Sequence, residues 1–160
     1  MTREFIRIDD RLIHGQVVLG WVNHLHTKQL ILCDDSVATS EWEKELYLSI
    51  VPDGLDAKVL SVEDTAEYIR EHPQEIEHTI ILLNGPSVVE NLIDKKVDLH
   101  DVNVGGIHYQ EGKKKYLTYL YLDNDDIASF SRCFHKGVHF DCQDVPEGKK
   151  IPLEKVVPLK

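Results

Sequence analysis

The chain has 160 residues, of which 42% are hydrophobic and 29% are charged, and its formal net charge at pH 7 is −10. These proportions are typical of one folded domain and exclude a largely disordered chain, a collagen and a coiled coil. The excess of acidic residues also argues against a nucleic-acid binder, which needs a basic face to displace counterions.

The amino-terminal residues are charged and lack the apolar stretch of a signal peptide, and no apolar run approaches the roughly 18 residues of a membrane span. The three cysteines, an odd number, indicate free thiols in a reducing, cytoplasmic setting. Two cysteines and two histidines lie within residues 133–142, but their spacing does not match the usual zinc patterns. We therefore expect neither a metal nor a cofactor.

Short apolar runs alternate with helical patterns through the first two thirds of the chain. The expected strands are 5–8, 30–33, 58–60 and 79–83. The expected helices are 15–26, one from Ser40 that ends at Pro52, one from Ser61 to about Arg70, and one opened by 85–86. Trp42, Leu46 and Ile50 recur every fourth residue, which is typical of the apolar face of a helix.

The last third changes character. Residues 102–106 form an expected strand that ends in a glycine turn, and 116–122 alternate as a half-exposed strand. Asp123 can begin a helix that Gly137 closes, and 138–142 form a final strand. Lys113–Lys115 fit a solvated turn. We expect one domain over residues 1–145 and a surface extension over 146–160.

Strands that alternate with helices predict a three-layer α/β sandwich. Its sheet should be mainly parallel, with helices on both faces and some antiparallel strands in the C-terminal third. Ligands bind beyond the carboxyl ends of the strands in such sheets. We therefore expect the site where four loops meet, and these loops are 9–14, 34–36, 84–86 and 103–108.

The most informative segment places His14 in a loop at the start of a helix. Free backbone N–H groups there favour an anion beside the imidazole, and Arg11 can bind phosphate oxygens. Gly15 permits close approach, and Asp9 or Asp10 could orient the ring so that its other nitrogen is a nucleophile. The residues thus suit a histidine that accepts a phosphoryl group, although a capping or surface histidine, or a general base, remains open.

The segment Arg7–Val17, RIDDRLIHGQV, closely resembles the active-site loop of the IIB component of the bacterial sugar phosphotransferase system, in its mannose/fructose/sorbose family. Segments 33–38, 84–90 and 103–107 resemble later loops of that family in the same order. Three features depart from the family pattern. Ile107 replaces a methionine and is followed by His108 and Tyr109, which is less typical, and residues 146–160 contain three prolines instead of a longer helix. The net charge of −10 is also acidic for a protein that docks a IIA domain and membrane subunits.

The resemblance implies a phosphotransferase of the protein-N(pi)-phosphohistidine–sugar type. His14 would accept the phosphoryl group from a partner IIA domain, and Arg11 would stabilise it. Asp9, Asp10, Gly15 and Gln16 would orient or cradle the site. Asp34, Asp35, Asn84 and His108 fall in the neighbouring loops.

The expected partners of such a protein are a IIA phosphodonor, the IIC and IID membrane subunits and a sugar substrate, but no nucleic acid. We therefore expect a cytoplasmic protein that associates with the membrane only through those subunits. The alternative is an orphan regulatory module, in which phosphohistidine signals through partner binding rather than sugar transport.

Overall fold

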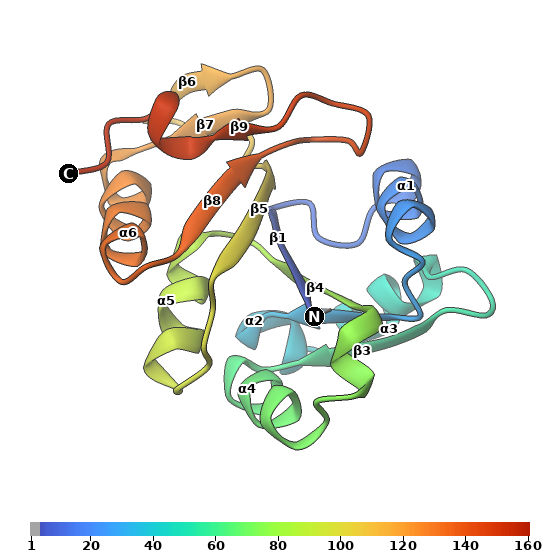
Figure 1. Ribbon diagram of the computed structural model, residues 1–160. Coiled ribbons are helices and arrows are strands. Elements are labelled where there is room, and N and C mark those ends of the chain that lie inside the picture. Colours follow the sequence, from blue (N-terminus) through green and yellow to red (C-terminus); the bar gives the residue numbers. More distant parts are fainter. Residues whose placement is uncertain (1–3) are drawn as a thin grey trace.

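The computed structural model describes residues 4–160, apart from the side chains of residues 16 and 17. A seven-stranded sheet runs through the middle of the molecule, with helices on both of its faces (Figure 1). Its strands are β1 (Phe5–Asp9), β2 (Gln29–Cys33), β3 (Asp56–Leu60), β4 (Thr79–Leu83), β5 (Asp101–Gly106), β8 (His139–Cys142) and β9 (Ile151–Pro152). Their spatial order is β3-β2-β4-β1-β5-β8-β9, and only β9 runs antiparallel to its neighbour.

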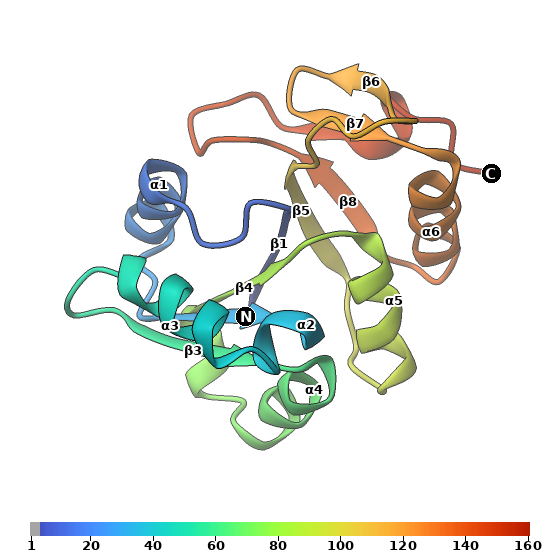
Figure 2. The same cartoon turned by 180° about the vertical axis from the view of Figure 1, so that it is seen from behind.

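Two hydrophobic clusters fill the space between the sheet and the helices. The helices are α1 (Gly15–Leu25), α2 (Asp35–Ala38), α3 (Glu41–Ile50), α4 (Val62–Glu71), α5 (Pro86–Asp94) and α6 (Asn124–His135). Side chains from α1 to α3 join the smaller cluster on one face, and those from α4 to α6 join the larger cluster on the other. Figure 2 shows α5 and α6 on the side of the sheet away from α1. This arrangement confirms the predicted fold class.

The helix starts follow from the capping residues in the sequence. The Ser40 side chain accepts a hydrogen bond from Glu43 N (3.3 Å), and Ser61 accepts one from Asp64 N (3.0 Å). At α6, Asp123 and Asp126 each accept a hydrogen bond from the other's backbone N–H. These bonds satisfy N–H groups that a helix leaves without an internal partner. Among residues 4–160, no helix is both long and apolar enough to cross a membrane.

The single strand predicted over 116–122 is wrong. The chain instead forms a hairpin of β6 (Lys114–Leu117) and β7 (Leu120–Leu122), which pair antiparallel. The predicted solvated turn at Lys113–Lys115 is also only partly right. Lys113 is nearly buried and donates to Asp126 (2.8 Å), so this lysine anchors the hairpin to the start of α6.

The segment after Pro146 is not merely a surface extension, because part of it joins the sheet and the core. β9 pairs with β8, and a short 3-10 helix, Leu153–Lys155, follows. Leu153 is fully buried and Val157 is 1% exposed. The segment is rich in lysine, glutamate and proline, so its composition did not indicate that Leu153 and Val157 would be buried.

The apolar stripe of α3 does not face the core. Trp42 is 71% exposed, Leu46 47% and Ile50 44%, and no residue of this helix is buried. Tyr47, Val51 and Leu55, which are partly buried, pack against the smaller cluster instead. The sequence correctly predicted that α3 is a helix. It did not predict that the face with Trp42, Leu46 and Ile50 would be exposed.

We expect Leu153→Ala to lower the free energy of unfolding by about 2–5 kcal/mol, because it removes buried methyl groups and leaves a cavity. Leu46→Ala is the matched control, and as an exposed substitution it should change that free energy by less than about 0.5 kcal/mol. Urea unfolding of both variants measures the difference. Equal effects would contradict the packing of the C-terminal segment described above.

Candidate active site

Parallel strands bring their carboxyl ends to one edge of the sheet, and the loops that follow β1 and β5 meet there. Asp10 N donates to Gly106 O (3.1 Å), which ties the loop after β1 to the end of β5. His14 is the N-cap residue of α1, so its side chain stands at the start of that helix. The structure thus brings together the predicted loops 9–14 and 103–108.

The Asp9 carboxylate is the centre of this group. It is fully buried, and one oxygen accepts from His14 Nε2 (2.9 Å), Arg11 Nη2 (3.1 Å) and Arg7 Nη2 (3.4 Å). The other oxygen accepts from the backbone N and the Nε of Arg11, both at 3.1 Å. A buried carboxylate needs such donors to remain ionised.

The hydrogen bonds at Asp9 decide its charge state. Burial alone would raise the pKa of Asp9, but the N–H donors of His14 and Arg11 outweigh burial and hold that pKa well below its ordinary value. Asp9 is therefore an acceptor at neutral pH, and the proton in its bond with His14 lies on the imidazole Nε2. The remaining nitrogen of a neutral His14, Nδ1, then carries a lone pair.

The backbone of the loop holds His14 in this place. Leu12 adopts a left-handed conformation (φ 59°) and is buried, and its N–H donates to Asp9 O (2.9 Å). Gly15 also has a positive φ, of 25°. A non-glycine residue with positive φ is strained, and such strain often occurs at functional sites. The predicted site residue Gln16 lies outside the described side chains.

Arg7 belongs to the site, although sequence reasoning assigned it no role. It is 2% exposed and donates to Asn103 Oδ1, Gln143 O (3.0 Å), Asp144 O (2.7 Å) and Asp9. A charged residue between two isoleucines of a buried strand was the available signal, because buried arginines are paired almost without exception. Its distant partners could not be read from the sequence.

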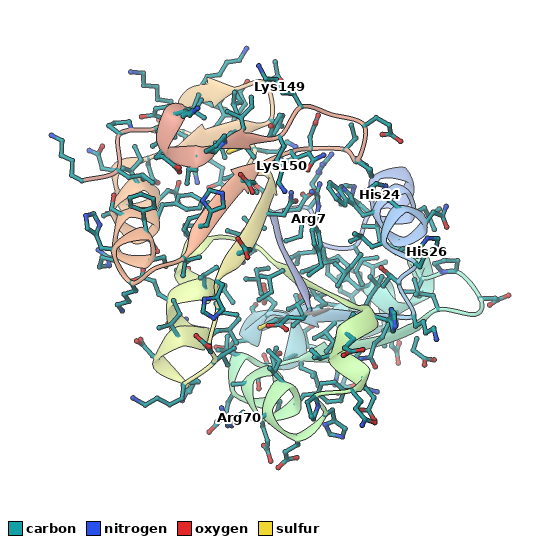
Figure 3. The ribbon with its side chains drawn as sticks, in the orientation of Figure 1. Arg7, His24, His26, Arg70, Lys149 and Lys150 are labelled. Atoms are coloured by element: carbon teal, nitrogen blue, oxygen red, sulfur yellow. The ribbon has the colours of Figure 1, made fainter. Side chains whose placement is uncertain are left out.

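A β-bulge makes room for Arg7. Ile8 pairs with Val104 but Asp9 pairs with Gly106, so Gly105 is an extra residue in β5. A Cβ atom at Gly105 would lie only 2.1 Å from Arg7 Cζ. In Figure 3 Arg7 lies in the interior, whereas Arg70 stands at the outer edge of the molecule.

The other side of Arg7 faces an aromatic ring. The centroid of the Trp21 ring lies 4.9 Å from Arg7 Cζ, and Trp21 Nε1 donates to the same Asp144 carbonyl that Arg7 uses. Burial lowers the pKa of Arg7 to about 10, and Asp9 and Asp144 oppose that shift. Arg7 therefore remains positively charged at neutral pH and supports the charge of Asp9.

Asp10 holds a second predicted site residue, His108. Asp10 Oδ1 lies 2.5 Å from His108 Nδ1, and Asp10 Oδ2 accepts from His108 N (2.8 Å). Asp10 and His14 have no direct bond in the described residues. The open question of which aspartate contacts His14 is therefore answered in favour of Asp9.

The remaining predicted residues lie in the loops after β2 and β4. Asp34 caps α2 through Val37 N (2.9 Å) and accepts from Asn84 Nδ2 (3.2 Å). Asp35 accepts from Val62 N (2.8 Å), so it tethers the start of α4. A cavity of about 510 Å³ is lined by Asp10, Asn84 and Ile107 among others, so the predicted loops after β1, β4 and β5 meet around it.

One trio of ligand-type side chains lies at the site. Oxygens of Asp9 and Asp10 and a ring nitrogen of His108 lie within 4.8 Å of one another. Both Asp9 oxygens already accept from arginine and histidine donors, which supply the positive charge that a metal ion would bring.

The three cysteines are buried, and burial raises the pKa of each thiol to about 12.

Comparison with known proteins identifies the family. A family model described as "PTS system sorbose subfamily IIB component" matches residues 3–160. The chain is a member of this IIB family. The family resemblance seen in the sequence is thereby confirmed, and the chain belongs to a group of phosphotransferase-system components.

Individual relatives agree with this assignment. The IIB chain is 33% identical over 148 residues to the sorbose-specific EIIB component of Klebsiella pneumoniae and covers 90% of that protein and 92% of its own length. It is 29% identical over 151 residues to the mannose-specific EIIAB component of Escherichia coli (strain K12), 94% of its own length. It spans about half, 47%, of that relative.

Solved structures support the same fold. The crystal structure of the IIBSor domain of the Klebsiella pneumoniae sorbose permease matches with a TM-score of 0.86 at 29% sequence identity. The match covers 97% of this IIB chain and 95% of that one. The mainly parallel sheet and the antiparallel C-terminal strands are thus features of the family fold.

We expect Gly105→Ala to lower the free energy of unfolding by about 1–3 kcal/mol, because the new methyl group would displace the buried Arg7 guanidinium. Gly106→Ala is the matched control, since a Cβ there meets its nearest atom at 3.4 Å. Chemical denaturation of the two variants tests this. A Gly106→Ala variant as unstable as Gly105→Ala would show that the contact with Arg7 is not the cause.

Asp9 should make stability depend on pH. Its pKa is lowered by folding, so its contribution is complete above the ordinary aspartate pKa of about 3.9 and is lost as the pH falls toward the lower folded-state pKa. At pH 7 we expect Asp9→Asn to be less stable than the wild type, and this gap to narrow below about pH 4. Urea unfolding across the pH range measures the gap, and a constant gap would contradict this account.

Proposed function

We propose that His14 of this IIB chain carries a phosphoryl group, which it accepts from a phosphohistidine of a IIA domain and passes to a sugar. The observation that carries the proposal is the 2.9 Å bond between His14 Nε2 and Asp9. This bond fixes the protonated nitrogen and leaves the Nδ1 lone pair for attack. A positioned carboxylate that orients a histidine is a recurring way to activate such a nucleophile.

The transfer is balanced without any further reactant. The Nδ1 lone pair attacks phosphorus, the bond between phosphorus and the donor nitrogen breaks, and the electron pair of that bond returns to the donor imidazole. His14 becomes positively charged as the new P–N bond forms. The Nε2–H of His14 remains hydrogen-bonded to Asp9, and the negative charge of Asp9 stabilises the positively charged product. In the second transfer a sugar hydroxyl oxygen attacks phosphorus, and the P–N bond to His14 breaks. The electron pair of that bond returns to Nδ1, so His14 is again neutral, and the hydroxyl proton is released to solvent.

Positive groups around His14 suit the charge of the phosphoryl group. The Arg11 side chain is 40% exposed, so its guanidinium is accessible while Asp9 holds one of its edges. The first backbone N–H groups of α1, which begins at Gly15, have no acceptor inside the helix. A helix start of this kind binds phosphate. Together these groups would hold the equatorial oxygens during in-line transfer.

The names of relatives support the proposed partners. A relative named EIIAB combines A and B components in one protein, which supports a IIA domain as donor. Relatives named as sorbose-, fructose- and N-acetylgalactosamine-specific components support a sugar as final acceptor. We propose that the chain works in the cytoplasm and reaches the membrane by docking to IIC and IID subunits.

The test is phosphorylation by phosphoenolpyruvate, the general phosphotransfer proteins and a cognate IIA, followed by intact-protein mass spectrometry. We expect one acid-labile phosphoryl group on the wild type and none on His14→Ala. Phosphorus NMR should assign the group to Nδ1, because Asp9 occupies Nε2. An unmodified wild type beside a phosphorylated IIA would refute the proposed function.

Arg11→Ala should slow the first transfer by about 100-fold, the usual scale for loss of a group that stabilises transition-state charge. Arg11→Lys keeps the charge but loses the planar fork and should retain part of the rate. Quenched-flow measurement of phosphoryl transfer from phosphorylated IIA compares the variants. A rate unchanged in Arg11→Ala would remove Arg11 from the mechanism.

A further inference from the structure

The loop after β1 builds two aspartate–histidine pairs from consecutive residues. Asp9 holds Nε2 of His14, whereas Asp10 holds Nδ1 of His108 at 2.5 Å. The opposite ring nitrogens, His14 Nδ1 and His108 Nε2, are therefore the ones left for other partners. The proposed function uses only the first pair.

The ring of His108 is held more firmly than that of an ordinary loop residue. Asp10 accepts from both its Nδ1 and its backbone N–H. The preceding residue, Ile107, is 3% exposed and exchanges backbone hydrogen bonds with Tyr119 O (3.0 Å) and Tyr121 N (2.9 Å). The imidazole is still 45% exposed, so a fixed ring presents a free edge to the surface.

The His108 ring and the Arg11 guanidinium lie near the same point above Gly106. A Cβ atom built on Gly106 would lie 3.4 Å from His108 Cε1 and 3.8 Å from Arg11 Nη2. Gly106 has no side chain, so the space that His108 and Arg11 border stays open.

Two carboxylates lie beside the His108 ring. An oxygen of Asp9 and one of Asp10 each lie within 4.8 Å of a ring nitrogen. Arg7, Arg11 and His14 are the basic groups at the site, and all three are bound to Asp9. A phosphoryl group on His14 would add further negative charge to this region.

We propose that His108 is a second phosphoryl-binding residue of this site. With its Nδ1 bound to Asp10, it donates an N–H at Nε2 to an oxygen of the phosphoryl group on His14, beside Arg11. This inference rests on the proposed function, since it requires a phosphoryl group there. It adds a specific contact from the loop after β5, which that mechanism does not use.

A purely structural role predicts the opposite pattern of substitutions. In that case His108 would matter only because its Nδ1 clamps the loop to Asp10. His108→Asn places an amide N–H near the position of Nδ1 and has no group at Nε2. His108→Gln places an amide N–H near the position of Nε2 and gives up the Nδ1 bond. The two variants therefore separate a phosphoryl contact from a loop clamp.

The experiment measures the rate of transfer from phosphorylated IIA and the lifetime of the phosphorylated IIB chain for the wild type, both variants and His108→Ala. We expect His108→Ala and His108→Asn to lose roughly tenfold or more in rate, the usual effect of one hydrogen bond to a charged group. His108→Gln should keep most of the rate. Thermal melts of each protein separate loss of folding from loss of contact.

Several results would overturn the inference. His108→Asn that matches the wild type while His108→Gln fails would assign a clamp, and equal rates in all variants would remove any role. A second phosphoryl group on the wild type that is absent from His108→Gln would make His108 an acceptor instead of a donor. Absence of phosphorylation on the wild type would refute the proposed function itself, so the two failures are distinguishable.

Discussion

The buried Asp9 carboxylate is the constraint on which the site depends. A charge without access to water needs several donors, and here they come from Arg7, Arg11 and His14. Each donor is thereby fixed in place: Arg7 in the interior, Arg11 at the surface and His14 at the start of α1. One electrostatic requirement thus links the core of the sheet to a side chain that can react.

Arg7 extends this constraint across the domain. Its other partners lie on β5 and on the segment after β8, far along the chain. The bulge at Gly105 and the ring of Trp21 shape the space that it occupies. The site is therefore rigid because distant parts of the fold converge on one guanidinium, and local loop sequence alone would not hold it.

Much of this was predictable from the sequence, where a local signal existed. Strand-length apolar runs, capping residues and the loop around His14 correctly predicted the fold class and the meeting of the loops after β1 and β5. Features set by distant contacts were not predictable. The partners of Arg7 and the core role of Leu153 depend on packing between distant segments, and the exposure of Trp42 depends on which face of α3 turns inward.

The two ends of the sheet also differ in how they avoid pairing with other chains. An edge strand presents unpaired backbone groups that can recruit a strand from another molecule. β9 covers the outer side of β8, so the C-terminal segment shields that end of the sheet. At the other end β3 stays uncovered, and its exposed Asp56 and Lys58 place charge there. A chain without residues 151–157 would therefore expose the edge of β8. It would also uncover the apolar surface on which Leu153 and Val157 pack, and together these would promote aggregation.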